Sequence, residues 1–199
     1  QLKPGIAEVY HRRAKIYYGK YEYDKAIQDF TETIKLKPGN GEAHYIRGMI
    51  YAKKGDSGKA IQDFGKAIQL IPGNAEAHYN RGMAYTKIGE LDKAIQDFDR
   101  AIQLNPENAK VYNNRGVIYY ITGKLDMAAQ DYDSATQLDP NYADAFFNRG
   151  MVYFDKSEFD RAIQDFDRTI QISPDYTDAY YSRGTIYYRS EEHTSELQS

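Results

Sequence analysis

Few side chains in this sequence could carry out chemistry, and cysteine is not among them. Without a thiol, the chain can form no disulfide, thiolate metal site or cysteine nucleophile. The versatile ligands and bases that remain are four histidines: His11, His44, His78 and His193. His44 and His78 are 34 residues apart and could approach each other as a metal pair, but no third ligand recurs beside them. We therefore expect both to be packing residues, and we predict no metal and no cofactor.

Acidic side chains recur at a regular spacing, which argues against catalysis. An active site needs one constellation of acid, base or nucleophile in a pocket, whereas the segment DFDR occurs both at 97–100 and at 165–168. Glycines also recur as single spacers and form no phosphate-binding cluster. We predict that the chain is not an enzyme and has no catalytic residues.

Proline marks the period of these recurrences. Successive prolines are always 34 residues apart: Pro4, Pro38, Pro72, Pro106, Pro140 and Pro174. Residues 41–74 and 75–108 are identical at 22 of 34 positions, and a fixed period of this length indicates a repeat array. Residues 1–6 are the end of a preceding repeat, and residues 177–188 are a truncated repeat. Between them lie five full repeats: 7–40, 41–74, 75–108, 109–142 and 143–176.

Each repeat contains two amphipathic stretches that must position its side chains. In the third repeat, the first stripe consists of Ala77, His78, Arg81, Gly82 and Tyr85, and the second of Leu91, Ala94, Ile95, Phe98, Ala101 and Ile102. The second helix should end at Leu104, because the residue before Pro106 is disfavoured in the α conformation. Glycines between the stretches suit a positive φ: Gly55, Gly89 and Gly123. Such a hairpin must stack on its neighbours, which predicts an all-α solenoid of antiparallel helix hairpins.

These positions resemble the tetratricopeptide repeat. Position 8 of each repeat is small, and position 11 is always tyrosine: Tyr17, Tyr51, Tyr85, Tyr119, Tyr153 and Tyr187. Position 20 is alanine in every full repeat, and position 24 is aromatic: Phe30, Phe64, Phe98, Tyr132 and Phe166. The resemblance covers residues 1–188. It implies a right-handed superhelical solenoid in which the first helices line a concave groove that receives a peptide or protein segment.

Position 7 departs from that family, which usually has leucine there. In this chain it is arginine: Arg13, Arg47, Arg81, Arg115, Arg149 and Arg183. Position 23 is aspartate in each full repeat: Asp29, Asp63, Asp97, Asp131 and Asp165. An arginine on the packing stripe is costly unless it is paired, so we predict a ladder of Arg–Asp contacts between the two helix layers. The alternative, arginines that bind phosphates, requires these side chains to be exposed.

The resemblance places positions 2, 5, 6, 9, 12 and 13 in the groove. Our candidate peptide-binding residues are taken from positions 5, 6 and 9: Asn80, Asn114, Asn148, Tyr45, Tyr79, Phe147, Met83 and Met151. An amide can both donate to and accept from a peptide backbone, so three asparagines in register suit an extended ligand. The asparagines could instead bond locally, and the apolar side chains could pack between neighbouring first helices. The sequence leaves these alternatives open.

Charge narrows the choice of partner. The formal net charge is -3, and five of the six residues at position 2 are acidic: Glu8, Glu42, Glu76, Asp144 and Asp178. This sign disfavours nucleic acid and suggests a protein or peptide with some basic character. Position 9 is never asparagine, which argues against the clamp that some family members use to bind chaperone tails. No apolar run approaches twenty residues, so we predict no membrane insertion.

The ends of the sequence affect the functional hypothesis. Residues 189–199, RSEEHTSELQS, resemble a translated sequencing adapter, and we interpret them as a non-native tail on a fragment. Our leading hypothesis is a non-catalytic scaffold for protein–protein interaction. The alternative is a substrate-recognition arm of a larger enzyme or signalling protein whose catalytic domain lies outside this sequence. Oligomeric state, compartment and partner identity stay undetermined.

Overall fold

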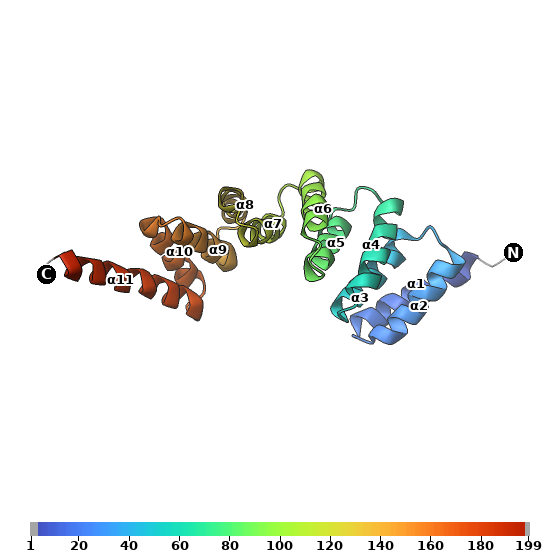
Figure 1. Ribbon diagram of the computed structural model, residues 1–199. Helices are drawn as coiled ribbons and strands as arrows, with labels where there is room; N and C mark the ends of the chain where they lie inside the picture. Colours follow the sequence, from blue (N-terminus) through green and yellow to red (C-terminus); the bar gives the residue numbers. More distant parts are fainter. Residues whose placement is uncertain (1–3, 198–199) are drawn as a thin grey trace. The chain divides into compact units, whose positions relative to one another are not determined.

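A computed structural model describes the backbone of residues 4–197 and the side chains of residues 5–189. Within this range the chain is helical and contains no strand (Figure 1). It divides into two compact units, Gln1–Pro106 and Glu107–Ser199. The first unit contains α1 (Pro4–Gly19), α2 (Tyr23–Leu36), α3 (Gly41–Lys53), α4 (Ser57–Leu70), α5 (Ala75–Lys87) and α6 (Leu91–Leu104). The second contains α7 (Ala109–Ile121), α8 (Leu125–Leu138), α9 (Ala143–Asp155), α10 (Phe159–Ile172) and α11 (Thr177–Leu197).

The predicted hairpins and their stacking are confirmed within each unit. The two helices of each full repeat pack against each other: α1 with α2, α3 with α4, α5 with α6, α7 with α8, and α9 with α10. Each second helix also packs against the first helix of the next repeat in the same unit: α2 with α3, α4 with α5, α8 with α9, and α10 with α11. A hairpin with a neighbour on each side therefore buries its apolar residues on both sides, as a repeat protein requires.

Local signals mark several of the helix ends. The side chains of Asn40 and Asn74 each accept a hydrogen bond at 3.0 Å from the backbone N–H three residues later, so they cap α3 and α5. The second helix of the third repeat ends at Leu104, as expected. The first repeat differs, because α1 already begins at Pro4. Proline is tolerated in the first turn of a helix, where its missing N–H has no intrahelical partner.

The far end of the array also continues as helix. The backbone of α11 extends past Tyr188 to Leu197, and so includes most of the segment that resembles an adapter. The side chains of 190–199 lie outside the described residues, and the origin of this segment stays a prediction.

The turn inside each hairpin requires a left-handed residue at position 15. Gly55, Gly89 and Gly123 have φ between 74° and 81°, as predicted for a position where a side chain is unfavourable. Tyr21 and Ser157 occupy the same position in the first and fifth repeats, and both have a φ of 60°. The geometry of the hairpin therefore imposes this conformation even where the residue is not glycine, at some cost in stability.

In the core of each hairpin, an aromatic ring of the second helix packs against a small residue of the first helix. The alanines at position 20 are fully buried, and the aromatic residues at position 24 are almost completely inaccessible. A Cβ atom on Gly82 would lie 2.7 Å from a ring carbon of Phe98, and one on Gly150 would lie 2.7 Å from Phe166. Glycine at position 8 thus lets the ring approach the backbone of the first helix.

The predicted Arg–Asp ladder is present. In each full repeat, the position-7 arginine donates from Nε and Nη2 to the two carboxylate oxygens of the position-23 aspartate, over distances of 2.6–2.8 Å. The aspartates are buried, with exposed fractions of 3–5%. Two parallel bonds hold the planar guanidinium against the carboxylate, so the pair joins the two helices in one register.

The third nitrogen of several arginines connects neighbouring repeats. Nη1 of Arg47 donates to Thr31 Oγ1 at 2.9 Å, and Nη1 of Arg149 donates to Asp133 Oδ1 at 2.7 Å. Thr31 and Asp133 both occupy position 25, on the second helix of the preceding repeat. Arg183 pairs in the same way with Asp167. One side chain therefore links its own hairpin to the one before it.

We predict that separating one Arg–Asp pair destabilises the fold through the aspartate that remains. Arg81→Leu should reduce the free energy of unfolding by about 3 kcal/mol, because the buried carboxylate of Asp97 loses both bonds from the guanidinium and keeps only its contact with His78. Adding Asp97→Asn should recover part of this loss, because it removes the buried charge that has lost its guanidinium partner. Urea denaturation followed by circular dichroism measures both variants. The exposed Arg12→Leu should change little. If the double variant is less stable than Arg81→Leu, the buried charge is not the cause.

We also predict that Ser157→Gly stabilises the protein. Removing the side chain from a left-handed residue should add about 1 kcal/mol, since L-residues are disfavoured in that conformation. Gly123→Ser makes the reverse change at the same position of the neighbouring repeat, and it should lower the melting temperature. Calorimetry of the two variants and the parent chain provides the test. Equal effects of the same sign would contradict the conformational explanation.

Candidate peptide-binding face

The first helices of the first unit form a hollow where sequence analysis places the groove. This α3–α5 hollow has a volume of about 290 Å³ and is lined by Met49, Ala52, Lys53, Ser57, Tyr79, Asn80, Met83, Ala84 and Lys87. Tyr79, Asn80 and Met83, three of the candidate residues, thus lie together and are half-buried. Apolar side chains form most of the wall, while Lys53 and Lys87 are exposed. Such a wall can receive an apolar side chain of a ligand.

Asn80 is held in place by contacts within the protein. Its Nδ2 donates to the Tyr45 hydroxyl at 3.2 Å and to the Glu76 carbonyl at 2.8 Å. Burial, together with the charge of Glu76, raises the pKa of Tyr45 to about 12, so its hydroxyl stays neutral. Both donors of the Asn80 amide are used in this way. Its Oδ1 accepts no hydrogen bond from the described residues, and is the atom that can accept one from a ligand.

In the second unit, an asparagine at position 6 again contacts position 5 of the preceding repeat. Asn148 Nδ2 donates to Asn113 Oδ1 at 3.0 Å, and Asn113 is buried. Asn113 is not among the residues predicted from the sequence, although position 5 is otherwise aromatic or histidine and an asparagine there is a usable signal. Asn114 is half-buried on α7. The local-bonding alternative therefore accounts for part of the asparagine pattern.

The candidate aromatic residues pack on the second helix of their own repeat. The ring centroids of Tyr45 and Phe64, and those of Tyr79 and Phe98, are 6.0 Å apart. Phe147 lies 5.7 Å from Phe166 and 5.0 Å from Tyr176 by the same measure. These rings are half-buried, so they join the core to the inner face. Packing thus explains their presence, while their remaining exposed area is available to a ligand.

Met151 also belongs partly to the core. It packs against the cluster that contains Tyr153 and Phe166, and its Sδ lies 3.8 Å from Ser182 Oγ. It is half-buried on α9, at the position that Met83 has on α5. The two methionines therefore occupy equivalent places in separate units.

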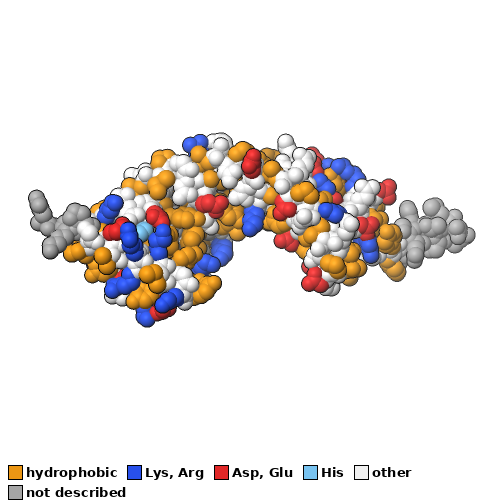
Figure 2. All heavy atoms as spheres, turned by 180° about the vertical axis from the view of Figure 1, so that it is seen from behind, with side chains coloured by type: hydrophobic (Ala, Val, Ile, Leu, Met, Phe, Trp, Pro, Cys, Tyr) orange, Lys and Arg blue, Asp and Glu red, His pale blue; other side chains and the backbone are white. Residues whose placement is uncertain are grey.

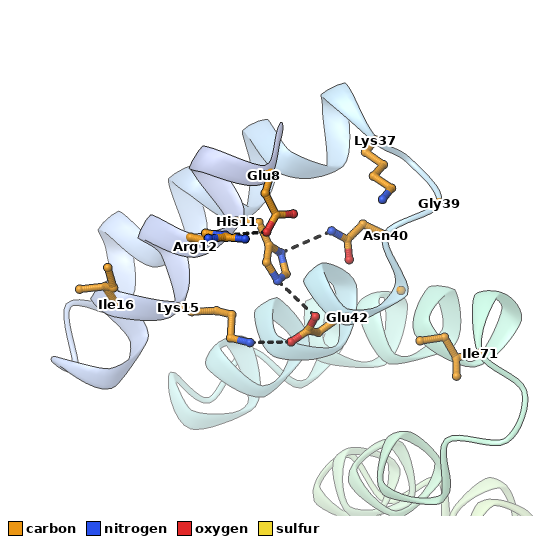
Figure 3. A pocket seen from close by; sticks show the side chains of 11 residues that line it. Glu8, His11, Arg12, Lys15, Ile16, Lys37, Gly39, Asn40, Glu42 and Ile71 are labelled. Carbon is orange, nitrogen blue, oxygen red and sulfur yellow. Dashed lines mark hydrogen bonds and ion pairs between the residues drawn. The ribbon is translucent and has the colours of Figure 1, made fainter. Parts of the chain in front are cut away.

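A second, charged hollow lies between α1 and α3 (Figure 3). Its volume is about 590 Å³, and it is lined by Glu8, His11, Arg12, Lys15, Ile16, Lys37, Gly39, Asn40, Gly41, Glu42 and Ile71. Glu42 bridges two basic side chains, with one oxygen 2.9 Å from Lys15 Nζ and the other 3.3 Å from His11 Nε2. Arg12 donates to Glu8 at 2.7 Å. This hollow is not predicted from the sequence, because Glu42 on α3 contacts residues of a different helix, α1.

The acids at position 2 are largely paired within the protein. The hydrogen bond from Lys15 lowers the pKa of Glu42, and the one from Arg12 lowers the pKa of Glu8. In the second unit, Asp144 accepts a hydrogen bond from the Tyr176 hydroxyl at 3.1 Å. On the surface seen in Figure 2, basic and acidic side chains are interspersed. These acids therefore attract a basic ligand less than the sequence suggests.

His44 and His78 do not face each other but bond to the aspartates of the ladder. Nδ1 of His44 lies 3.0 Å from Asp63 Oδ1, and Nδ1 of His78 lies 2.9 Å from Asp97 Oδ1. Burial tends to raise the pKa of Asp63, but the bonds from Arg47 and His44 lower it overall. The described part of the chain contains no group of three or more histidine, cysteine, aspartate or glutamate residues that could hold a metal ion.

The fifth repeat has no histidine beside its buried aspartate. There, phenylalanine occupies position 4, and Arg149 is the main partner of the aspartate. Burial raises the pKa of Asp165 above its ordinary value despite the bonds from Arg149. In the second and third repeats, His44 and His78 instead add a second contact to the buried carboxylate, and both are buried packing residues.

Among the described helices, none combines the length and apolar character needed to cross a membrane.

Comparison with known proteins agrees with the geometry above. A family model described as TPR repeat matches residues 48–89, 118–157 and 150–190. Models described as Tetratricopeptide repeat match residues 7–40, 75–108 and 98–130. A search of curated proteins gives no match.

Several solved structures are similar to this one. A crystal structure of MamA is 28% identical, with a TM-score of 0.78, over 83% of this chain and 96% of that chain. YrrB, described as a TPR protein with an unusual peptide-binding site, is 26% identical, with a TM-score of 0.78, over 88% of this chain and 90% of its own. A tetratricopeptide repeat protein from Parabacteroides merdae shares the fold at 19% identity, with a TM-score of 0.81, over 98% of this chain and 77% of that chain. The present chain belongs to the tetratricopeptide repeat family.

Proposed function

We propose that this protein is a non-catalytic interaction scaffold whose first helices bind an extended segment of a partner protein. Membership of the tetratricopeptide repeat family supports the scaffold role. The similarity to YrrB, which is described as having a peptide-binding site, supports a peptide as the form of the ligand. The inner face, formed by positions 5, 6 and 9 of the first helices, is the surface that we assign to binding.

The α3–α5 hollow is the observation that carries this proposal. Met49, Met83 and Ala84 offer an apolar pocket, and Asn80 lies in the same wall. Methionine adapts to different apolar shapes, so the pocket suits an apolar side chain without demanding one residue type. Lys53 and Lys87 line the same hollow and are exposed, which favours a carboxylate next to the apolar anchor.

The contacts of Asn80 define how it would engage a peptide. Tyr45 and Glu76 use its two donors and fix the orientation of the amide. The carbonyl oxygen is then the group offered to the ligand, and it can accept one backbone N–H of an extended peptide. Asn148 is fixed in a comparable way by Asn113 in the second unit. We propose that these asparagines act as pre-oriented acceptors, which lowers the entropy lost on binding.

Selection of peptides tests the proposal. The full chain is panned against a phage-displayed library of random 12-residue peptides, and enriched peptides are measured by isothermal titration calorimetry. Asn80→Ala should weaken binding by about three- to tenfold, as expected for one lost hydrogen bond. Met83→Ala should weaken it by about tenfold, because the apolar pocket loses contact area. Asn141→Ala, in an exposed loop, is the matched control and should bind normally.

A purely structural role gives a different result. In that case Asn80→Ala and Met83→Ala lower the melting temperature, yet the folded variants bind the selected peptides as the parent chain does. This outcome, or a failure of the library to yield any peptide that distinguishes Met83→Glu from the parent chain, would contradict peptide binding at the α3–α5 hollow.

A further inference from the structure

The fourth repeat differs from the other full repeats at one place in its core. In the others, a ring at position 5 of the first helix contacts the phenylalanine at position 24 of the second helix. The ring centroids lie 5.7–6.0 Å apart: His11 with Phe30, Tyr45 with Phe64, Tyr79 with Phe98, and Phe147 with Phe166. The fourth repeat has Asn113 at position 5 and Tyr132 at position 24. An amide and a hydroxyl therefore occur where the other repeats pack ring on ring.

Both side chains are buried, yet part of their hydrogen-bonding capacity is unused. Asn113 is 5% exposed and Tyr132 is 1% exposed. Asn113 Oδ1 accepts the bond from Asn148, but neither Asn113 Nδ2 nor the Tyr132 hydroxyl has a hydrogen-bond partner among the described residues. Every fully buried side-chain nitrogen and oxygen of the described residues does have a partner. The two unpartnered atoms therefore lie where solvent still reaches them, at an opening of the core.

Unpaired polar groups are costly next to a core, and packing does not require them here. A buried donor without a partner loses its bonds to water and gains none in return. Burial raises the pKa of Tyr132, so its hydroxyl stays neutral and keeps its proton. Phenylalanine fills position 24 in all the other full repeats, and it differs from tyrosine only by the hydroxyl. The hydroxyl of Tyr132 thus needs an explanation other than packing.

Asn148 completes a small polar site, which we name the amide recess. It consists of Asn113 on α7, Tyr132 on α8 and Asn148 on α9, all in the second unit, and is distinct from the α3–α5 hollow. The bond of 3.0 Å between the two asparagines fixes their amides relative to each other. Asn113 Nδ2 and the Tyr132 hydroxyl are the available donors, and Asn148 Oδ1 is an acceptor to which no described residue donates. A complementary ligand group carries an acceptor and a donor side by side.

We propose that the amide recess binds the side-chain carboxamide of a glutamine or asparagine in the ligand, an inference that rests on the proposed binding of a peptide to the inner face. The carboxamide oxygen accepts from Asn113 and Tyr132, and the NH₂ group donates to Asn148 Oδ1. That oxygen has two lone pairs, so it can accept from the carboxamide and from a backbone N–H of the same ligand. Tyr132 belongs to the second helix of its hairpin, so a ligand on the first helices reaches it with a side chain.

A charged side chain fits the amide recess less well. A carboxylate could accept from Asn113 and Tyr132, but it would face the oxygen of Asn148. The arginine of the same repeat, Arg115, already donates to both oxygens of Asp131. An ammonium group would oppose the N–H groups of Asn113. Burying either charge in a neutral site is costly, so the recess selects a neutral group that both donates and accepts.

One variant gives the fourth repeat the core of its neighbours. Asn113→Tyr combined with Tyr132→Phe, which we call the restored variant, has the residues of the second and third repeats at positions 5 and 24. It should fold and melt at a higher temperature than the parent chain, because both unpaired polar groups are gone. Asn141→Tyr changes an exposed loop asparagine of the same unit and is the matched control. Circular dichroism measures the folding of the three chains.

Peptide selection supplies the probes. The random peptide library is panned in parallel on the full parent chain and on the restored variant, and enriched peptides are measured by isothermal titration calorimetry. Peptides that only the parent chain enriches should contain a glutamine or asparagine. Exchanging that residue for glutamate or methionine should weaken binding to the parent chain by about tenfold, as expected when a buried polar group loses its partner. Asn141→Tyr should bind the same peptides as the parent chain does.

The outcomes separate this inference from the proposed function. Peptides that distinguish Met83→Glu, but not the restored variant, from the parent chain would overturn the inference and leave the proposed function standing. The inference is also wrong if the peptides lost on the restored variant carry no carboxamide, or if their glutamate forms bind the parent chain equally well. A library that yields no peptide sensitive to either change overturns both.

Discussion

The structure depends on one recurring interaction, the buried pair between the position-7 arginine and the position-23 aspartate. The carboxylate is removed from water, so it is stable only when the guanidinium and its other donors satisfy it. Two parallel hydrogen bonds allow little rotation or sliding, and the pair therefore fixes how the first helix lies on the second. The contact of the Phe98 ring with Gly82 follows from this register, because it brings the backbone of the first helix against the aromatic ring.

The inner face follows from the same register. With position 7 directed at the second helix, positions 5, 6 and 9 of successive first helices come to lie near one another within a unit. Asn80 can then donate to Tyr45, and Met83 shares a hollow with Met49. The side chains that we assign to ligand binding are thus held by the packing that stabilises the repeat. This rigidity is useful in a binding surface, because little conformational entropy remains to be lost when a peptide docks.

The arginines also join some hairpins to their neighbours. Inside a unit, Nη1 of Arg47 or Arg149 joins a hairpin to the one before it. Arg13 and Arg81 keep their two bonds to the aspartate of their own hairpin, at Asp29 and Asp97, without a bond to a second repeat among the described residues. One side chain type therefore fixes the register of every full hairpin and, at Arg47 and Arg149, also joins it to the hairpin before it.

The sequence by itself determined the repeat period, the two helices of each repeat, the glycine turns and the Arg–Asp pairing, because each rests on local periodicity or on the cost of burying an unpaired charge. Only the tertiary structure decided which side chains of different repeats meet. The bond between Asn148 and Asn113, the bridge from Lys15 to Glu42 and the left-handed conformation of Ser157 depend on how neighbouring helices and turns pack. The two side-chain contacts join residues about one repeat apart, and the conformation of Ser157 is set by the packing of both helices of its hairpin. A local pattern within one helix therefore does not predict them.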